Sequence, residues 1–292
     1  MTALSPGNVC LQLPADPRDW AIRFLERQGL TVSSITRIGG GTHGEVFRLD
    51  VDYNSTTGPD FVVKVFDVSR KHFSAVAVRN EFDVLRRLAT GAAHRAAPMA
   101  CPEPIAIAPS GDAYLMTSMD GKTLDDHLLN GTNHRHTSAD LAETIVAALA
   151  YFYDVIGDCY ADFEPGNVLI GDEGVCLLDP LVPNPTFLPA RSELRWYPST
   201  ADIGYWVEQV AAHAVRQTVQ YPRLARARIA FTRELVAAAA AAFAPEDEDA
   251  YRAEVVAVAD YHIARYRRLI GRRWLVHEFW APRIARRCAL VR

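Results

Sequence analysis

The sequence predicts an α+β protein in two lobes, a β-rich lobe followed by a helical lobe. Strand-like runs separated by Gly and Pro turns dominate up to about residue 119, and longer stretches with apolar residues at helical spacing dominate after it. We therefore place the N-terminal lobe at residues 1–119 and the helical C-terminal lobe at residues 120–292. With 292 residues, the chain is long enough for two lobes that each have a core.

The composition is that of an ordinary globular protein. The hydrophobic share is 49% and the net charge is -4, so no global basic excess favours nucleic acid as the main partner. No window approaches the roughly 18 apolar residues of a membrane span, and the first residues lack the basic start and apolar core of a secretory signal. The five cysteines are scattered without metal-binding spacing, which is typical of reduced thiols. We expect a cytoplasmic protein with no membrane partner.

Residues 33–52 read as two strands joined by a glycine-rich turn. Gly39, Gly41 and Gly44 stand in GxGxxGxV order, which Val46 completes. Glycines in such a turn let backbone N–H groups approach phosphate oxygens closely. A dinucleotide-binding fold needs a helix at this point, but the residues after the glycines alternate and are β-prone, so we predict a hairpin. A plain glycine turn without a ligand is the alternative.

The β-rich lobe also contains one lysine in the middle of an apolar strand, over residues 61–66. Lys64 could point to solvent at a sheet edge, or it could face the phosphates of a nucleotide. Glu81 lies beside the apolar face of a helix predicted over 79–88, where it could form an ion pair with Lys64. The alternative for Glu81 is a solvated helix charge.

The stretch from Tyr160 to Leu181 carries the polar residues of the second lobe. Asp162 and Asn167 lie in a loop interrupted by Pro and Gly. Two short strands follow, joined by a turn over 171–174, and this hairpin would return Asp179 to the side of Asn167. Oxygen ligands of this kind suit Mg²⁺, and one spare carboxylate could orient a hydroxyl group. An ordinary hairpin with solvated acidic ends is the alternative.

Helices account for most of the second lobe. Thr137 and Asp140 form a capping-box pattern that opens a helix over 139–156. Further helices are predicted over 202–217, 223–243 and 281–290, and residues 245–249 are expected to start another helix that runs to about Ile270. Asp202 lies at the N-terminus of the 202–217 helix, where its negative charge interacts favourably with the helix dipole. It could also accept hydrogen bonds from the backbone of the Asp162 loop. The Arg-rich C-terminal part is read as a solvated face, with a patch for an acidic partner as the alternative.

Together these elements resemble the protein-kinase-like fold: a GxGxxGxV hairpin, a strand Lys, a helix Glu, a DxxxxN loop and a hairpin that ends in Asp. The resemblance covers nearly the whole chain. It implies that Asp162 is the catalytic residue that orients the substrate hydroxyl and that Asn167 and Asp179 hold Mg²⁺. The implied nucleotide-binding residues are Gly39, Gly41, Thr42, Gly44, Val46, Lys64, Glu81, Met116, Ser118 and Met119.

Departures from the protein-kinase pattern point toward small-molecule kinases. Tyr160 and Ala161 stand where protein kinases have His-Arg, Pro180 follows Asp179 in place of Phe, and no Ala-Pro-Glu appears. The Asp162 stretch is more similar to the aminoglycoside phosphotransferase group, in which acidic residues often receive cationic substrates. This resemblance implies transfer of the ATP γ-phosphate, with Mg²⁺, to a hydroxyl of an unidentified small molecule. The alternatives are an atypical Ser/Thr protein kinase and a pseudokinase that acts as a nucleotide-binding scaffold.

Overall fold

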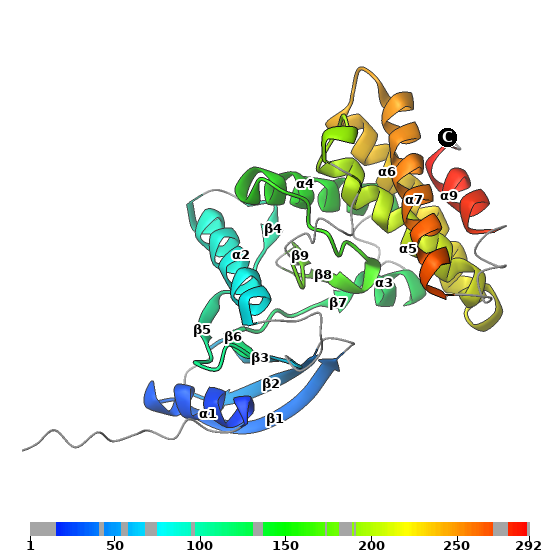
Figure 1. Ribbon diagram of the computed structural model, residues 1–292. Coiled ribbons are helices and arrows are strands. Elements are labelled where there is room, and N and C mark those ends of the chain that lie inside the picture. The colour runs from blue at the N-terminus through cyan, green and yellow to red at the C-terminus, as the bar shows by residue number, and fades with distance from the viewer. Residues whose placement is uncertain are drawn as a thin grey trace, which may run out of the picture. The chain divides into compact units, whose positions relative to one another are not determined.

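The computed structural model describes residues 16–40, 44–53, 58–67, 75–94, 97–130, 137–172, 174–180, 189, 191–270 and 280–290. The chain divides into two compact units. The first comprises Met1–Phe82 and Glu103–Ser118, and the second comprises Asp83–Pro102 and Met119–Arg292. The first unit contains an antiparallel sheet and the second is largely helical (Figure 1), so the predicted α+β class is confirmed.

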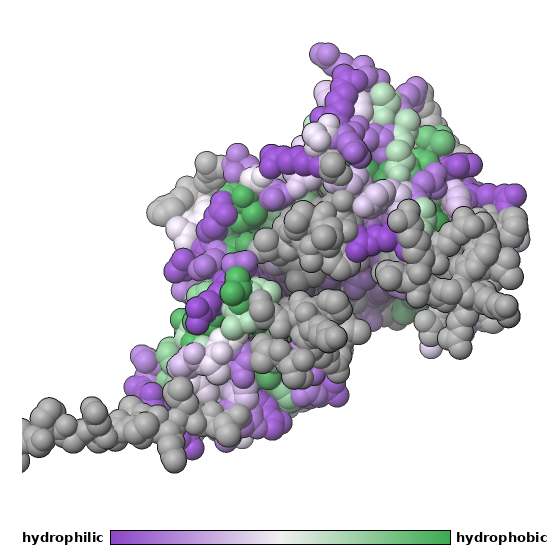
Figure 2. Space-filling model, viewed as in Figure 1, coloured by the Kyte–Doolittle hydropathy of each residue, from purple (hydrophilic) through white to green (hydrophobic). Residues whose placement is uncertain are grey.

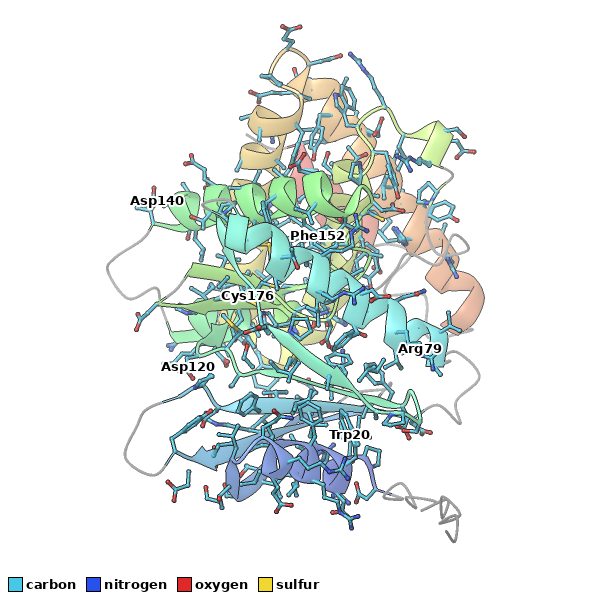
Figure 3. All side chains as sticks on the ribbon, turned by 90° about the vertical axis from the view of Figure 1, so that its left-hand side faces the viewer. Trp20, Arg79, Asp120, Asp140, Phe152 and Cys176 are labelled. Atoms are coloured by element: carbon cyan, nitrogen blue, oxygen red, sulfur yellow. The ribbon has the colours of Figure 1, made fainter. Side chains whose placement is uncertain are left out.

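The first unit is built on a five-stranded antiparallel sheet with the strand order β1-β2-β3-β6-β5. Its strands are β1 (Thr31–Gly40), β2 (Gly44–Asp52), β3 (Phe61–Phe66), β5 (Pro104–Ile107) and β6 (Ala113–Thr117). Helix α1 (Pro17–Arg27) covers one face of this sheet, with Trp20 packed against the sheet core (Figures 1 and 3). The side chain of Asp16 caps the helix by accepting a hydrogen bond of 2.9 Å from the Arg18 N–H.

The glycine-rich segment is a hairpin, as predicted, because β1 and β2 pair directly as antiparallel neighbours. Gly44 has a packing reason to be glycine: a Cβ at this position would lie 2.0 Å from the carbonyl oxygen of Val65 on β3. At Gly39, a Cβ would meet only ordinary contacts, the nearest at 3.7 Å from Val46. The predicted turn residues Gly41 and Thr42 lie outside the described residues.

Helix α2 (Ala75–His94) is longer than the predicted 79–88 segment. Its residues up to Phe82 belong to the first unit, and those from Asp83 belong to the second. In the second unit, Val84 and Leu88 of this helix join the main core cluster. One helix therefore contributes both Glu81 to the first unit and core side chains to the second.

The second unit consists mainly of helices packed around a common core. They are α3 (Leu124–Asn130), α4 (Ser138–Ile156), α5 (Ser199–Gln220), α6 (Pro222–Phe243), α7 (Glu248–Ile270) and α9 (Ala281–Ala289). Helix α5 packs against α6, α7 and α9, and α4 packs against α6 (Figure 1). The acidic turn between α6 and α7 lies at the hydrophilic top of the face in Figure 2.

Local capping signals predict the ends of α4 but not the start of α5. Thr137 and Asp140 form the predicted capping box, and Gly157 ends α4 with φ 80, the left-handed conformation that glycine adopts readily. Helix α5 begins at Ser199, three residues before the predicted start, and no side chain caps it. The Ser199 hydroxyl donates to the Trp196 carbonyl instead, at 2.8 Å.

A small four-stranded sheet with the order β4-β9-β8-β7 lies in the second unit. The predicted hairpin forms its centre, with β8 (Val168–Gly171) paired to β9 (Gly174–Leu177). Two short strands that we did not predict flank it, β4 (Met99–Ala100) and β7 (Lys122–Thr123). Among the described residues, no helix is long and apolar enough to cross a membrane.

Candidate functional site

A row of paired residues crosses the sheet of the first unit and includes three of the predicted nucleotide-binding residues. Gly39 pairs with Val46, Val46 pairs with Lys64, and Lys64 pairs with Tyr114. Directly opposed residues in antiparallel strands project from the same face. Val46, Lys64 and Tyr114 therefore share one face, and Met116, two residues beyond Tyr114 on β6, shares it as well.

Lys64 takes part in a buried polar network, which we call the lysine network: Lys64, Glu81 and Tyr114. The Lys64 ammonium lies 2.7 Å from Oε1 of Glu81, and the Tyr114 hydroxyl donates to the same oxygen at 2.7 Å. The Lys64 side chain is 9% exposed and that of Glu81 is 1% exposed. The predicted ion pair is therefore present, and the solvent-facing alternative for both residues is wrong.

The lysine network is buried because β3 is a central strand rather than a sheet edge. Tyr114 was not among the predicted site residues, although its place opposite Lys64 follows from the β3–β6 register. Its ring packs against Phe82 and Phe66, and the Lys64 ammonium lies 5.0 Å from the centre of the Phe66 ring. Removing one partner of such a buried charge pair costs about 3–5 kcal/mol, because the other charge stays desolvated.

The remaining predicted nucleotide-binding residues lie at the end of β6 and just beyond it. The N–H of Ser118 donates to the Asp60 carbonyl at 2.7 Å, which ties this segment to the start of β3. Ser118 is the last residue of the first unit and Met119 begins the second. Met116, Ser118 and Met119 are all half-buried. Their contact with a nucleotide remains a prediction.

In the second unit, Asp202 holds the backbone of the loop that carries Asp162. Its two carboxylate oxygens accept hydrogen bonds from the N–H groups of Tyr160 at 2.7 Å and Ala161 at 2.8 Å. This is the arrangement predicted for Asp202. Ala161 has φ 72, a left-handed conformation that costs a residue with a Cβ about 1–3 kcal/mol. The buried carboxylate thus supports a strained backbone immediately before Asp162.

Tyr160 and Phe163 of this loop are buried in the core, whereas Asp162 between them is half-buried. The Tyr160 ring is fully buried, with its centre 5.3 Å from that of Phe152 and 6.2 Å from that of Phe163. Phe163 in turn packs on Trp206 of α5 at 4.6 Å. Tyr160, which stands where kinases have His, is therefore a core residue in this protein. The Asp162 side chain lies between these two anchors and is half-buried.

Asn167 and Tyr205 both contact the Asp162 carboxylate. The Asn167 amide donates to Oδ2 at 3.1 Å and to the Asp162 carbonyl at 3.0 Å. The Tyr205 hydroxyl of α5 donates to Oδ1 at 3.3 Å. Sequence reasoning missed Tyr205, although it lies one helical turn after Asp202 and so on the same side of α5. Its ring packs edge-on against buried His262 of α7, whose pKa burial lowers to about 4.

The β8–β9 hairpin places Asp179 near Asn167, as predicted. The N–H of Leu178 donates to the Asn167 carbonyl at 2.8 Å, so Asp179 follows directly at the open end of the hairpin. Asp179 has φ 57, which Asp tolerates better than most residues. Within the described part of the chain, no three His, Cys, Asp or Glu side chains are grouped to hold a metal ion.

The Asn167 and Asp179 pair nevertheless fits Mg²⁺. This ion is usually bound by one or two carboxylates, with substrate phosphates and water completing the octahedron, rather than by a cage of protein ligands. Because the amide nitrogen of Asn167 donates to Asp162, its side-chain oxygen is the atom that remains to bind a cation. The donor set is therefore a carboxamide oxygen and a carboxylate, both hard ligands.

Three buried or half-buried carboxyl groups in or near the Asp162 loop have raised pKa values. Burial raises the pKa of Asp202 from its ordinary 3.8 to about 7, although its two backbone hydrogen bonds act in the opposite direction. Burial also raises the pKa of Glu164 to about 7, and the charge of Asp162 adds to this effect. On α5, burial raises the pKa of Glu208 to about 8. These three carboxyl groups therefore titrate near neutral pH rather than near pH 4.

The Arg-rich C-terminal part is described only in part. The side chains of Arg267, Arg268, Arg272 and Arg273 lie outside the described residues. On α9, Arg286 lies 3.4 Å from Asp260 of α7, and both side chains are partly exposed. The patch for an acidic partner therefore stays a prediction.

Comparison with known families supports the resemblance seen in the motifs. No curated protein matches the chain. Residues 34–157 match the model of the phosphotransferase enzyme family APH, a range that runs from β1 to Gly157. It includes Lys64 and Glu81 but ends before Asp162, Asn167 and Asp179. This match confirms that the chain resembles the aminoglycoside phosphotransferase and protein-kinase-like group over residues 34–157.

Proposed function

We propose that this protein transfers the γ-phosphate of ATP to a hydroxyl group of a small molecule, with Mg²⁺ as the metal ion. The observation that carries the proposal is the position of the Asp162 carboxylate, which accepts hydrogen bonds from Asn167 and Tyr205 on a loop held by Asp202. A carboxylate held this way can orient a hydroxyl and accept its proton. The family match over residues 34–157 supports the same reaction class.

In the proposed reaction the acceptor oxygen forms a bond to the γ-phosphorus of ATP. The bond from that phosphorus to the bridging oxygen of ADP breaks, and ADP leaves with the electron pair. The hydroxyl proton passes to Asp162. Phosphoryl transfer of this kind depends mainly on positioning and on charge neutralisation.

The other site residues would serve positioning and charge. Lys64, held by Glu81, would contact the α- and β-phosphates, and the glycine-rich hairpin would offer backbone N–H groups to them. Asn167 and Asp179 would hold Mg²⁺, which neutralises charge on the phosphates when bound. Met116, Ser118 and Met119 would contact the adenine.

Two measurements test this function. Calorimetry with ATP and Mg²⁺ compares the wild type with Lys64→Met, and Lys122→Met is the control because Lys122 is exposed on β7. Transfer of labelled γ-phosphate to hydroxylated metabolites, antibiotics and protein extracts then compares the wild type with Asp162→Asn. Its control is Asp172→Asn, in the exposed β8–β9 turn. A thermal melt of each variant separates loss of function from loss of folding.

We expect tight binding only with Mg²⁺, weaker binding in Lys64→Met, and transfer that Asp162→Asn lowers roughly 10²- to 10⁴-fold. If ATP does not bind with Mg²⁺, or if Asp162→Asn transfers phosphate normally, the proposed function is wrong. Binding of ATP without any transfer that depends on Asp162 would indicate a nucleotide-binding scaffold. Transfer to proteins but not to small molecules would indicate an atypical protein kinase.

A further inference from the structure

A cavity of about 290 Å³ lies within the second unit, next to the Asp162 loop. Glu164, two residues after Asp162, lines it together with Gln209, Gln217 and Arg228 from helices α5 and α6. Ligand pockets for drug-sized molecules span about 300–1,000 Å³, so this cavity suits a small ligand. A hydroxyl group on a ligand held there would be close to the residues that carry the proposed chemistry.

Arg228, the single arginine among the described residues that line this cavity, is already paired. Its Nε donates to Asp125 on α3 at 2.7 Å, and its Nη2 donates to the other oxygen of the same carboxylate. Its Nη1 donates to the side-chain oxygen of Gln217 at 3.0 Å. The side chain of Arg228 is 9% exposed and that of Asp125 is 22% exposed. A bidentate pair of this kind leaves neither charge ready for a charged ligand.

Besides this pair, the described polar residues that line the cavity are three glutamines, His213, Tyr221 and Glu164, and burial raises the pKa of Glu164 to about 7. Gln209, which is 6% exposed, uses its amide nitrogen to donate to Glu208 at 3.0 Å, so its oxygen remains to accept a hydrogen bond. Gln217 uses its oxygen for Arg228, so its amide nitrogen remains to donate one. A hydroxyl group is both donor and acceptor, so this alternation matches a ligand that carries several hydroxyls.

We propose that this cavity binds the acceptor and selects an uncharged polyhydroxylated molecule of about monosaccharide size. The inference rests on the proposed function and narrows it, because it names the chemical class of the acceptor. A polycationic acceptor would need several carboxylates without cationic partners, but the described residues that line the cavity include only two carboxyl groups, Glu164 and Asp125, and Arg228 occupies Asp125. An anionic acceptor would need an arginine that is not already paired. In either case, a desolvated charge without a partner lowers affinity.

Variants of the Asp125–Arg228 pair test this selection, because they make the charge of the cavity more negative or more positive. Arg228→Gln leaves Asp125 without its cation, and Asp125→Asn leaves Arg228 without its anion. The double variant removes both charges. Arg226→Gln is the matched control, since Arg226 lies on the same helix with an exposed side chain. Three probes with one skeleton are compared: a neutral hexose, the corresponding amino sugar and the corresponding sugar acid.

Binding of each probe is measured by ligand-observed NMR, which needs no turnover, and phosphate transfer is measured beside it. We expect the wild type and Arg226→Gln to prefer the neutral hexose by roughly tenfold or more. Arg228→Gln should shift the preference toward the amino sugar, and Asp125→Asn should shift it toward the sugar acid. The double variant should prefer the neutral sugar again.

A wild type that prefers a charged probe, or that binds none of the three, refutes the inference. So does a preference that neither single variant changes. The restored preference of the double variant guards against effects of misfolding in the single variants. If phosphate passes to a cationic acceptor in a manner that depends on Asp162, the proposed function stands and the acceptor class is wrong. If Asp162→Asn does not affect transfer, the proposed function itself is wrong.

Discussion

Replacing Asp202 by Asn tests how the Asp162 loop is held. In the variant, one carboxylate oxygen becomes an NH₂ group that faces the N–H of Tyr160 or Ala161. A buried backbone donor without an acceptor costs about 1–3 kcal/mol. Ala161 then loses a contact that supports its left-handed backbone. We expect transfer to fall roughly 10²-fold, since displacement of a catalytic group by about 1 Å has that effect.

The pH dependence of stability gives the variant a second and independent signature. The ordinary pKa of Asp202 is 3.8, and burial raises it to about 7 in the folded protein. Between these pH values the folded protein keeps a proton that the unfolded chain has released. The free energy of unfolding therefore falls as the pH rises, by at most about 1.4 kcal/mol per pH unit. From pH 5 to pH 7 this group lowers it by about 2 kcal/mol.

Asn does not titrate, so the variant lacks this decline. The loss of unfolding free energy caused by Asp202→Asn should therefore be about 2 kcal/mol larger at pH 5 than at pH 7. Urea unfolding at both pH values measures it, with the fluorescence of buried Trp206 reporting on the second unit. Exposed Asp172→Asn is the control. An equal loss at both pH values would refute the raised pKa, and undiminished transfer would refute the role of the two hydrogen bonds.

Two further substitutions test particular contacts. Tyr205→Phe removes the hydroxyl that donates to Asp162 at 3.3 Å. We expect phosphate transfer to fall about fivefold, which corresponds to the loss of about 1 kcal/mol, with the melting temperature unchanged. Unchanged transfer would show that this hydrogen bond does not contribute to the reaction. Gly44→Ala would place a methyl group 2.0 Å from the Val65 carbonyl, and the resulting strain of about 1–3 kcal/mol should lower the melting temperature of the first unit. Gly39→Ala should leave that temperature unchanged, and equal melting of both variants would contradict the assigned packing.

Local patterns in the sequence were enough to predict the fold class and several site contacts. The capping box at Thr137 and the Gly157 stop depend only on neighbouring residues, so the sequence alone predicts them. The two hairpins follow from turn residues flanked by β-prone runs, and the hairpin after Asn167 accounts for the return of Asp179. Asp202 could be linked to the Asp162 loop because both belong to a motif order resembling that of kinases.

Contacts between distant segments were not predictable in the same way. Strands β4 and β7 have only two residues each, so they carry no periodic signal and exist through pairing with the β8–β9 hairpin. The start of α5 was placed too late because its first turn has no side-chain cap and is held in part by a tertiary contact, the hydrogen bond of 2.6 Å that Thr200 donates to Glu254 of α7. Tyr205 was missed because a hydroxyl on a helix shows no sign in sequence of the carboxylate it meets.

The sequence by itself thus determined the α+β class, the hairpins and the candidate residues for phosphoryl transfer, because these depend on local propensity and on motif order. Only the tertiary structure decided which charges are already paired. It buries Lys64 against Glu81, and it joins Asp125 to Arg228 across 103 positions of the chain. An ion pair between such distant positions depends on helix packing, which no short window of sequence encodes. The charge state of the cavity, and with it the proposed class of acceptor, follows from that packing.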